Sequence, residues 1–381
     1  MSKNACLEVK DGKSLENLKD FLKALLEKNL VDALLIPQEV PSGENVFQTL
    51  VTDTDHLEEA NALAPVMPVN SAKLVAHLTV INPGKKIGAV LRSCEIRALI
   101  ELVKLKQATL DNLLIMGIDC LGTYSVTDYA SFVQTTDGKY SPTGVVLAAA
   151  EEAKEISANG YHPRSACQIC EFPTPQTSDL VIGLIGVDPK KEILLQAQTP
   201  AGEEILSKLG LEETREANKR EEILTTLVEE RKKKKNQVFE ETEKEVLDIP
   251  SLLAVFSKCI RCYNCKTACP ICYCKECLFE TPTFNYTPEK YLRMAKRKGA
   301  IKMPTDTLLF HLTRMNHMIT SCVGCGQCES ACPSNIPLLK IFRTLGDKVQ
   351  KIFDYVPGRK IEEELPLATF KEDELKEIGG E

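Results

Sequence analysis

The sequence predicts two domains of different class, an α/β domain with a mostly parallel sheet over residues 1–200 and an α+β domain over residues 250–345. Three observations lead to this prediction. Helix and strand patterns alternate in the first half, a charged segment follows them, and eleven of the sixteen cysteines lie between Cys259 and Cys332. The length of 381 residues is enough for two or three domains. With 43% hydrophobic and 27% charged residues, the composition excludes wholesale disorder.

The first elements of the α/β domain follow from hydrophobic periodicity. Residues 14–30 place leucines and a phenylalanine on one face, which predicts an amphipathic helix. A buried strand is expected at residues 33–36 and a second strand at residues 46–51. A short helix is expected at residues 71–79. These elements would form the beginning of the sheet and its first covering helices.

The clearest unit of the chain is a βαβ crossover. Two apolar strands at residues 87–91 and 113–118 are joined by one helix at residues 95–106. Strands joined in this way should be parallel and covered on both faces. Further strands at residues 180–185 and 192–196 could extend or edge the sheet.

The second half of the chain is organised by charge. Residues 201–249 are rich in Glu, Lys and Arg, which predicts a solvated helical connector. Nucleic-acid binding through the lysines at residues 232–235 is disfavoured, because acidic residues flank them closely. Residues 251–350 carry 14 Lys and Arg against 6 Asp and Glu, although the whole chain has a net charge of −7. Residues 346–381 are expected to be an acidic tail, loosely held over its last twenty residues from Glu362.

The sixteen cysteines are expected to be reduced and bound to metal. The N-terminal segment carries charges where a secretory signal would have its apolar core. No apolar stretch reaches the roughly 20 residues that a membrane-spanning helix needs. A chain of this size folds without disulfides, which are rare in the cytoplasm. The sequence therefore predicts a cytoplasmic protein without a membrane span.

Two cysteine motifs share one spacing. The motifs are Cys-Ile-Arg-Cys-Tyr-Asn-Cys-Lys-Thr-Ala-Cys-Pro at residues 259–270 and Cys-Val-Gly-Cys-Gly-Gln-Cys-Glu-Ser-Ala-Cys-Pro at residues 322–333. Both fit C-x2-C-x2-C-x3-C-P, the spacing of bacterial-type dicluster ferredoxins with two [4Fe–4S] clusters. The two motifs begin 63 residues apart, which implies an insertion between the halves of such a domain. A zinc module is the alternative, but zinc needs no third cysteine at this interval.

In this spacing the fourth cysteine of each motif binds the cluster held by the other motif. The pairing is therefore crossed and defines two sets of ligands. The first set is Cys259, Cys262, Cys265 and Cys332, and the second set is Cys269, Cys322, Cys325 and Cys328.

A third set is expected in the α/β domain. Cys94 and Cys120 follow two neighbouring parallel strands, at the sheet edge where open α/β sheets place their ligand sites. Cys167 and Cys170 form a C-x2-C pair in a loop. The third set is therefore Cys94, Cys120, Cys167 and Cys170, which could hold a third [4Fe–4S] cluster or could simply be small core residues.

Four cysteines remain outside these sets. Cys272, Cys274 and Cys277 could hold a further metal with an outside ligand, or they could be packing residues, and Cys6 has no predicted role. The helix that contains His311 and His317 is interpreted as structural.

The chain resembles a known family. The residues that carry the resemblance are Leu-Arg-Ser-Cys-Glu-Ile-Arg-Ala at 91–98, Asn-Leu-Leu-Ile-Met-Gly-Ile-Asp-Cys at 112–120 and Cys-Gln-Ile-Cys at 167–170. They are similar to the beta subunit family of coenzyme F-420 hydrogenases and dehydrogenases. With the ferredoxin motifs included, formate dehydrogenase beta subunits are the closest likeness, over about residues 15–345. The resemblance implies a third cluster on the third set, with a flavin (FAD) beside it.

The sequence departs from this family at the place where flavin-binding members carry a Gly-Gly loop. The equivalent segment has only Gly12, and side chains obstruct the close approach that a glycine pair allows. The remaining candidate for a phosphate site is Asn70, Ser71 and Ala72, at the N-terminus of a predicted helix. Flavin binding therefore stays open.

The function predicted from these features is that of an iron–sulfur electron-transfer subunit in an anaerobic oxidoreductase complex of the formate dehydrogenase or hydrogenase type. No molybdopterin site, nickel site or catalytic residue is identified, so substrate chemistry would belong to a catalytic partner subunit. A heterodisulfide-reductase-like or ferredoxin-like redox protein could be a second partner. The basic residues at 290–298 could dock an acidic partner. The alternatives are a flavoenzyme acting on a soluble carrier such as a deazaflavin, and a zinc-stabilised scaffold.

Overall fold

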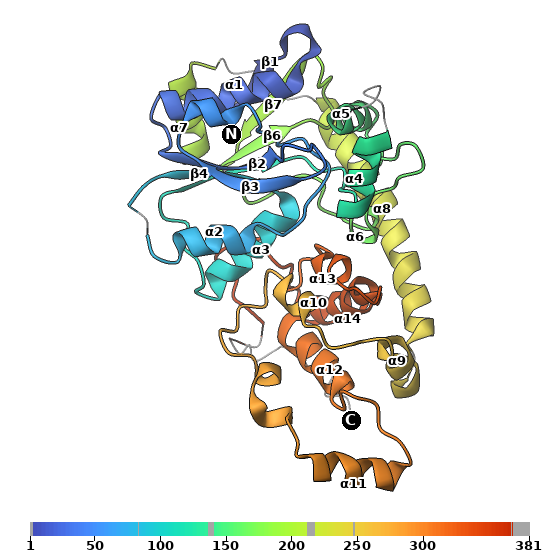
Figure 1. The fold of residues 1–381 in the computed structure, drawn as a ribbon. Coiled ribbons are helices and arrows are strands. Elements are labelled where there is room, and N and C mark those ends of the chain that lie inside the picture. Colours follow the sequence, from blue (N-terminus) through green and yellow to red (C-terminus); the bar gives the residue numbers. More distant parts are fainter. Residues whose placement is uncertain are drawn as a thin grey trace.

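The structure is a computed structural model that describes residues 3–82, 84–135, 141–211, 218–246, 248–366 and 368. The α/β domain lies at one end, and the cysteine-rich domain lies against one edge of it (Figure 1). The helix α8 runs along both domains (Figure 1).

A seven-stranded sheet forms the centre of the first domain, in the order β1-β7-β6-β5-β4-β2-β3. The three central pairings, β2 with β4, β4 with β5 and β5 with β6, are parallel, and the outer pairings are antiparallel. The strands are β1 (Asn4–Glu8), β2 (Ala33–Glu39), β3 (Val46–Val51), β4 (Ile87–Arg92), β5 (Leu113–Ile118), β6 (Leu180–Gly183) and β7 (Glu192–Ala197). The predicted βαβ crossover is therefore confirmed as a parallel pair.

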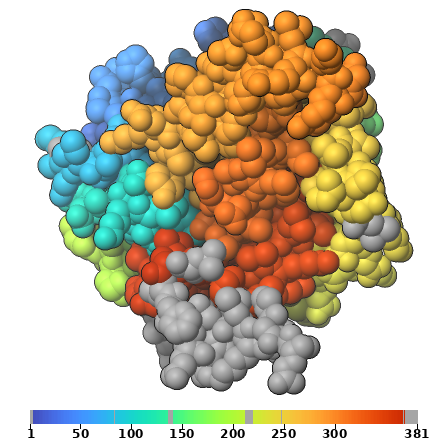
Figure 2. Space-filling model, turned by 90° about the horizontal axis from the view of Figure 1, so that it is seen from below, coloured from blue at the N-terminus to red at the C-terminus, as the bar shows by residue number. Residues whose placement is uncertain are grey.

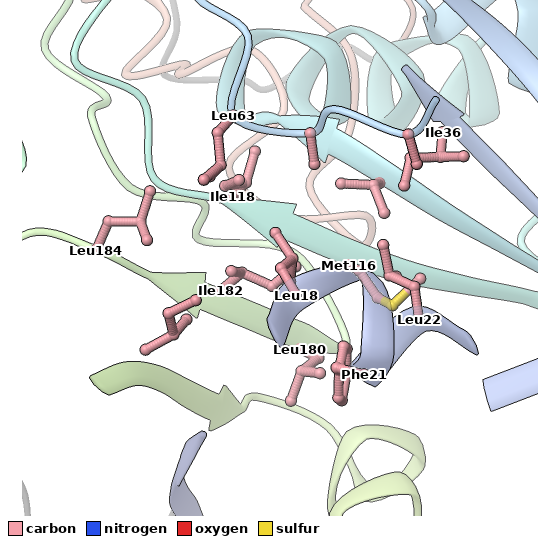
Figure 3. Packing of buried hydrophobic residues seen from close by; sticks show 14 of the residues in the cluster. Leu18, Phe21, Leu22, Ile36, Leu63, Met116, Ile118, Leu180, Ile182 and Leu184 are labelled. Carbon is pink, nitrogen blue, oxygen red and sulfur yellow. The ribbon is translucent and has the colours of Figure 1, made fainter. Parts of the chain in front are cut away.

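Helices cover both faces of this sheet. The helices of the first domain are α1 (Ser14–Glu27), α2 (Ala72–Thr79), α3 (Ser93–Lys104), α4 (Val126–Thr135), α5 (Pro142–Glu152), α6 (Ser165–Gln168) and α7 (Pro200–Leu209). Short 3-10 turns are η1 (Lys10–Gly12) and η2 (Thr54–Leu57). The helix α1 turns Leu18, Phe21 and Leu22 onto the alternate residues Met116 and Ile118 of β5 (Figure 3). The opposite face of the sheet packs against α2 and α3.

The sheet differs from the sequence prediction at two strands, β1 and β6. The strand β1 was not predicted, and it pairs with β7 from Asn4 opposite Gln196 to Glu8 opposite Glu192. The strand β6 ends at Gly183 rather than at residue 185. The N–H groups of Leu184 and Ile185 instead donate to the Asp119 carboxylate, at 2.8 and 2.9 Å.

The second domain consists of helices and loops around a core of phenylalanines. Its helices are α9 (Ile249–Phe256), α10 (Asn264–Thr267), α11 (Pro288–Lys298), α12 (Thr307–Met318), α13 (Gln327–Ser330) and α14 (Leu338–Ile352), with 3-10 turns η3 (Leu278–Glu280) and η4 (Pro282–Phe284). The strands expected of an α+β domain are not among the elements described here. The short helices α10 and α13, which begin inside the two cysteine motifs, contact each other.

The predicted connector is less solvated than expected. It contains α7 and α8 (Asn218–Glu245), apart from residues 212–217 and 247, which lie outside the described ranges. Side chains four residues apart on α8, those of Leu227, Arg231, Lys235 and Phe239, are buried. Their partners come from elsewhere in the chain, for example Glu171 and Asp347, which both pair with Lys235 at 2.8 and 3.1 Å.

The boundary expected at residue 346 falls inside α14. Beyond this helix the chain returns to the first domain, where the Tyr355 hydroxyl and the Gly358 N–H both donate to the buried Glu101 carboxylate, at 2.5 and 2.8 Å. The chain is therefore packed against the first domain at Tyr355 and Gly358. Residues 367 and 369–381 of the predicted tail lie outside the described part of the chain.

Candidate metal centres

The first set of cysteines surrounds one cavity. Cys259, Cys262, Cys265 and Cys332 all line one small hollow, together with Phe310 and His311. Three of these cysteines come from the first motif and Cys332 comes from the second. Crossed pairing places them together in this way.

Left-handed backbone shapes both motifs. Arg261 and Tyr263 have φ angles of 56° and 63°, and Gly324 and Gly326 occupy the same positions of the second motif with 73° and 74°. These turns direct backbone N–H groups toward the sulfur atoms, and the Arg261 N–H lies 3.4 Å from the Cys259 Sγ. The N–H groups of Gly324 and Gln327 donate in the same way to Cys322 and Cys325.

Two side chains that the sequence analysis treated as structural also contact the first set. His311 Nε2 lies 3.3 Å from the Cys259 Sγ, and Arg314 Nη1 lies 2.9 Å from the Cys265 Sγ. Burial lowers the pKa of His311 to about 3, and the positive charges of Arg314 and Arg261 contribute. The pair stands at i and i+3 on one helix, and this spacing was the available signal in the sequence.

The second set is packed between the two domains. Burial raises the pKa values of Cys322, Cys325 and Cys328, and the nearby Cys269 thiol raises them further. Near Cys322, the charge of Arg343 partly opposes this shift. Because Cys269 raises the pKa values of all three thiols, this cysteine of the first motif lies beside the three cysteines of the second motif.

The third set assembles at the edge where the parallel strands end. Cys94 follows β4 in the first turn of α3, and Cys120 follows β5. Burial raises the pKa of Cys94, and Glu95, Cys325, Cys120 and Cys170 add to the shift. Burial also raises the pKa of Cys120 to about 11, with contributions from Cys167 and Cys170. The four thiols therefore lie close enough to influence one another.

Cys167 differs from the other members of the third set. Burial would raise its pKa, but Arg164 and hydrogen bonds from Thr123 outweigh burial and lower it. The Thr123 N–H lies 3.4 Å and Arg164 Nη2 lies 3.8 Å from the Cys167 Sγ. One cysteine of this set is therefore prepared to be a thiolate.

The second and third sets adjoin each other across the domain interface. Cys325 is among the groups that shift the pKa of Cys94. The contact is held by hydrogen bonds from Gln327 Nε2 to the Met67 carbonyl at 2.8 Å and from Ser165 Oγ to the Glu329 carboxylate at 2.6 Å. The three sets therefore form a series through the molecule: first, second, third.

The arrangement of the thiols fits cubane clusters. Thiols that are buried together with raised pKa values need a cationic partner to ionise together, and iron ions would supply it. In the described ranges, no group of three or more Cys, His, Asp or Glu side chains is arranged to hold a single metal ion. A cubane separates its cysteines more widely than one zinc ion does, because each sulfur binds a different iron atom.

The candidate phosphate site is already hydrogen-bonded within the protein. The Ser71 N–H and hydroxyl donate to the Glu95 carboxylate at 2.9 and 2.5 Å, and the Ala72 N–H donates to Asn70 Oδ1 at 3.1 Å. Asn70 Nδ2 is buried and has no partner among the described residues. Arg92, Ser71 and Glu95 line a hollow of about 260 Å³ at this place.

The three cysteines outside the sets share a separate hollow. Cys272, Cys274 and Cys277 line this hollow together with the exposed His317. The structure brings them together but arranges no single-ion site among the residues it describes. The role predicted for this trio is therefore the same as before: a further metal with an outside ligand, or packing.

Two ferredoxin-spaced sets, joined to a third set at the carboxyl edge of a parallel sheet, define an iron–sulfur protein of the electron-carrier class. Two family models match the chain. Residues 84–223 match the coenzyme F420 hydrogenase/dehydrogenase beta subunit, C terminus, and residues 255–336 match the 4Fe-4S dicluster domain. The resemblance that the motifs predicted is confirmed, and so is the predicted fold class, a mostly parallel α/β domain with a dicluster ferredoxin domain.

Two curated relatives match most of the chain. The F420-dependent formate dehydrogenase subunit beta of Methanocaldococcus jannaschii is 29% identical over 365 residues, which is 89% of this chain and 90% of the relative. The F420-dependent formate dehydrogenase 1 subunit beta of Methanococcus maripaludis is 28% identical over 372 residues, 91% of each chain.

A solved structure of the F420-reducing [NiFe] hydrogenase complex from Methanosarcina barkeri contains a similar chain. The TM-score is 0.48 at 15% identity, with 65% of this chain and 94% of that chain covered. None of the helices in the described ranges combines the length and the apolar character that crossing a membrane requires.

Proposed function

We propose that the chain is the iron–sulfur electron-transfer subunit of an oxidoreductase complex of the formate dehydrogenase or hydrogenase type. The observation that carries the proposal is the series of three cysteine sets, in which the first and second sets exchange a cysteine and Cys325 of the second adjoins Cys94 of the third. The names of the two curated relatives, both formate dehydrogenase beta subunits, support it.

Each set would hold one [4Fe–4S] cluster, and bound clusters supply storage for one electron at a time. The chain's own contribution is to place the sets in order and to balance their negative charge. Arg314 contacts the first set, Arg343 lies near the second, and Arg164 contacts the third. Buried cations at each set would stabilise the ionised thiols.

We place the substrate chemistry in a catalytic partner subunit, because the curated relatives are named as subunits of larger enzymes. A heterodisulfide-reductase-like or ferredoxin-like protein would exchange electrons at the opposite end of the series. The proposal includes a cytoplasmic location, because thiols that bind iron–sulfur clusters must stay reduced and the cytoplasm is a reducing compartment.

One measurement tests the proposal as a whole. Protein purified without oxygen should contain about twelve iron and twelve acid-labile sulfide per chain, the content of three cubanes. Its visible absorbance should be bleached by dithionite. Zinc in place of iron, without that absorbance, would establish the scaffold alternative and overturn the proposal.

The third set has its own test. Cys94→Ser and Cys170→Ser should each remove the same paramagnetic signal and leave the two ferredoxin-type signals in place. Cys6→Ser is the matched control, because Cys6 lies on β1, at the edge strand of the sheet. If both variants keep three reducible clusters, Cys94 and Cys170 are core residues only.

A flavin beside the third set is a second candidate cofactor. The buried, unpartnered Asn70 Nδ2 favours a ligand there, whereas the N–H groups of Ser71 and Ala72 are already occupied. Flavin analysis of the same preparation decides whether FAD is bound at this place. Stoichiometric FAD, with turnover of a deazaflavin in the absence of any partner, would make the chain a flavoenzyme in its own right.

We propose that the partner docks on α11, which carries Lys290, Arg293, Lys296, Arg297 and Lys298. None of the residues of this helix is buried, and Leu292 is 70% exposed. The helix belongs to the orange segment that lies across the face seen from below (Figure 2). Such a cluster fits an acidic surface of the catalytic subunit, with association that weakens as salt rises.

Charge reversal tests this docking surface. Arg293→Glu, Lys296→Glu and Arg297→Glu together should slow electron delivery from the partner at low salt and leave the iron content unchanged. The control reverses three exposed lysines of the first domain, Lys10, Lys13 and Lys28. Equal rates for the two triple variants at low salt would remove the docking role of α11.

A further inference from the structure

The helix α12 belongs to the insertion between the two cysteine motifs, and it carries two side chains onto the first set. His311 and Arg314 stand one turn apart on this helix and are 1% and 4% exposed. His311 Nε2 lies 3.3 Å from the Cys259 Sγ. The Arg314 guanidinium donates from Nη1 to the Cys265 Sγ at 2.9 Å and from Nη2 to the Cys265 carbonyl at 3.0 Å.

Aromatic rings hold both side chains in these positions. The His311 ring stacks on Phe256, with the ring centres 4.0 Å apart and the planes 5° from parallel. The Arg314 guanidinium lies over the rings of Phe310 and Phe342, at 5.6 and 5.2 Å from their centres. Packing of this kind leaves each group little freedom, so its hydrogen-bonding direction is set before any cluster binds.

Arg314 is a buried charge that pairs with no carboxylate in the described part of the chain. Such a charge is costly unless a negative group compensates it. Its partners are the sulfur and the carbonyl oxygen of Cys265, and its Nε atom has none. An ionised Cys265 within an anionic cluster would supply the missing negative charge.

The hydrogen bonds at the second set differ from those at the first set. The hydrogen bonds that its thiols accept come from backbone N–H groups, those of Gly324 and Gln327. Arg343 near Cys322 and Arg314 near Cys328 act on this set by charge, without a hydrogen bond to those sulfur atoms. The first set receives backbone N–H groups as well, from Arg261 and Ile336, and has the two buried side chains in addition. Hydrogen bonds and positive charge at the sulfur atoms stabilise the reduced form of a cluster, which carries one more negative charge.

We propose that His311 and Arg314 raise the reduction potential of the first cluster above that of the second, so that the first cluster takes up an electron before the second. The inference rests on the proposed function, since it requires clusters on both sets. It deepens that function, because the first set includes the exposed Cys262 and lies in the same domain as α11. The easily reduced cluster would then face the proposed docking side.

The test is a redox titration of the full-length protein under anaerobic conditions, followed by electron paramagnetic resonance. A Cys262→Ala protein identifies the signal of the first cluster by its loss. Arg314→Gln, which removes the charge, should make the midpoint of that signal more negative by about a tenfold change in the reduction equilibrium, about 59 mV for one electron. His311→Phe keeps a ring on Phe256 without the N–H and should give a smaller shift in the same direction.

Two further variants separate tuning from folding. Arg314→Lys keeps a charge near Cys265 and should shift the midpoint less than Arg314→Gln. His317→Gln, on the exposed side of the same helix, should leave every midpoint unchanged. Iron and sulfide content should stay at the unsubstituted level in all four variants.

The outcomes are distinguishable. Retained iron with unchanged midpoints in Arg314→Gln and His311→Phe would overturn the inference and leave the proposed function intact. Loss of iron from Arg314→Lys would also overturn it, since Arg314 would then only hold the fold. Absence of clusters from the unsubstituted protein would instead overturn the proposed function.

Discussion

The two cysteine motifs have the same backbone conformation at two matching positions, but different residues adopt it. At two matching positions the first motif has Arg261 and Tyr263 where the second has Gly324 and Gly326, and all four have φ angles between 56° and 74°. Residues with a Cβ atom adopt this left-handed conformation at a cost of about 1–2 kcal/mol each, whereas glycine adopts it without that cost. The first motif therefore carries strain that the second avoids.

The reason lies in what surrounds each motif. A Cβ atom on Gly326 would lie 2.4 Å from the Cβ of Ala166, next to Cys167 of the third set, and one on Gly324 would lie 2.8 Å from Arg343. The second motif thus has no room for side chains at these positions, because the first domain packs onto Gly326 and α14 of the second domain packs onto Gly324. The first motif faces the insertion, where Arg261 pairs with Asp306 and the Tyr263 hydroxyl donates to the Phe279 carbonyl at 2.6 Å. Glycine therefore occurs where neighbouring elements pack closely onto the motif, with Gly326 at the domain interface, and side chains occur where the insertion attaches.

The largest expected effect tests what the motifs share. Cys262→Ala and Cys325→Ala should each lower the iron content by about four per chain, the content of one cubane. The Cys325 variant should also disturb the third set, because Cys325 adjoins Cys94. Iron and sulfide analysis checks both, and unchanged iron in either variant would show that its cysteine is not a ligand.

The next effect tests the interface. Gly326→Ala should destabilise the protein by about 2–5 kcal/mol, the sum of the left-handed backbone cost and overpacking against Ala166. Thermal unfolding and limited proteolysis between the domains would measure it. Tyr263→Ala, at the matching position of the first motif, is the control and should leave the domain contact resistant to protease. Equal protease sensitivity of the two variants would mean that Gly326 has no special role at the interface.

A smaller effect is expected where the insertion attaches. Arg261→Gly relieves about 1–2 kcal/mol of backbone strain but leaves the nearly buried Asp306 without its partner, which costs about 3–5 kcal/mol. The net result should be a loss of about 1–4 kcal/mol in the free energy of unfolding, measured by thermal unfolding. Adding Asp306→Ala should recover most of it, because no unpaired charge then remains. A double variant no more stable than the single one would contradict the role of this ion pair.

The smallest effect concerns one hydroxyl. Tyr263→Phe removes the hydrogen bond to the Phe279 carbonyl and should cost about 1 kcal/mol, with iron content unchanged. Tyr273→Phe, whose ring is 42% exposed, is the matched control and should show no measurable change in unfolding temperature. A larger loss from the control than from Tyr263→Phe would contradict this assignment.

Features that depend on local spacing could be predicted from the sequence alone. The cysteine intervals predict the two ferredoxin-type sets, because three of the four ligands of each cubane lie at fixed intervals within one short segment. The alternation of apolar runs predicts β4, α3 and β5, because a βαβ unit buries both faces of its strands. Since parallel strands end at one edge, the positions of Cys94 and Cys120 could also be deduced before the structure was known.

Only the tertiary structure decided which polar residues are buried. His311 and Arg314 read as ordinary residues of a structural helix until the fold places them on Cys259 and Cys265. The sequence predicts that Lys235 belongs to a solvated basic run, but in the structure it pairs with Glu171 and Asp347 from two distant segments. A charged side chain is buried only when distant parts of the chain bring its counter-charge, and no local pattern records that pairing.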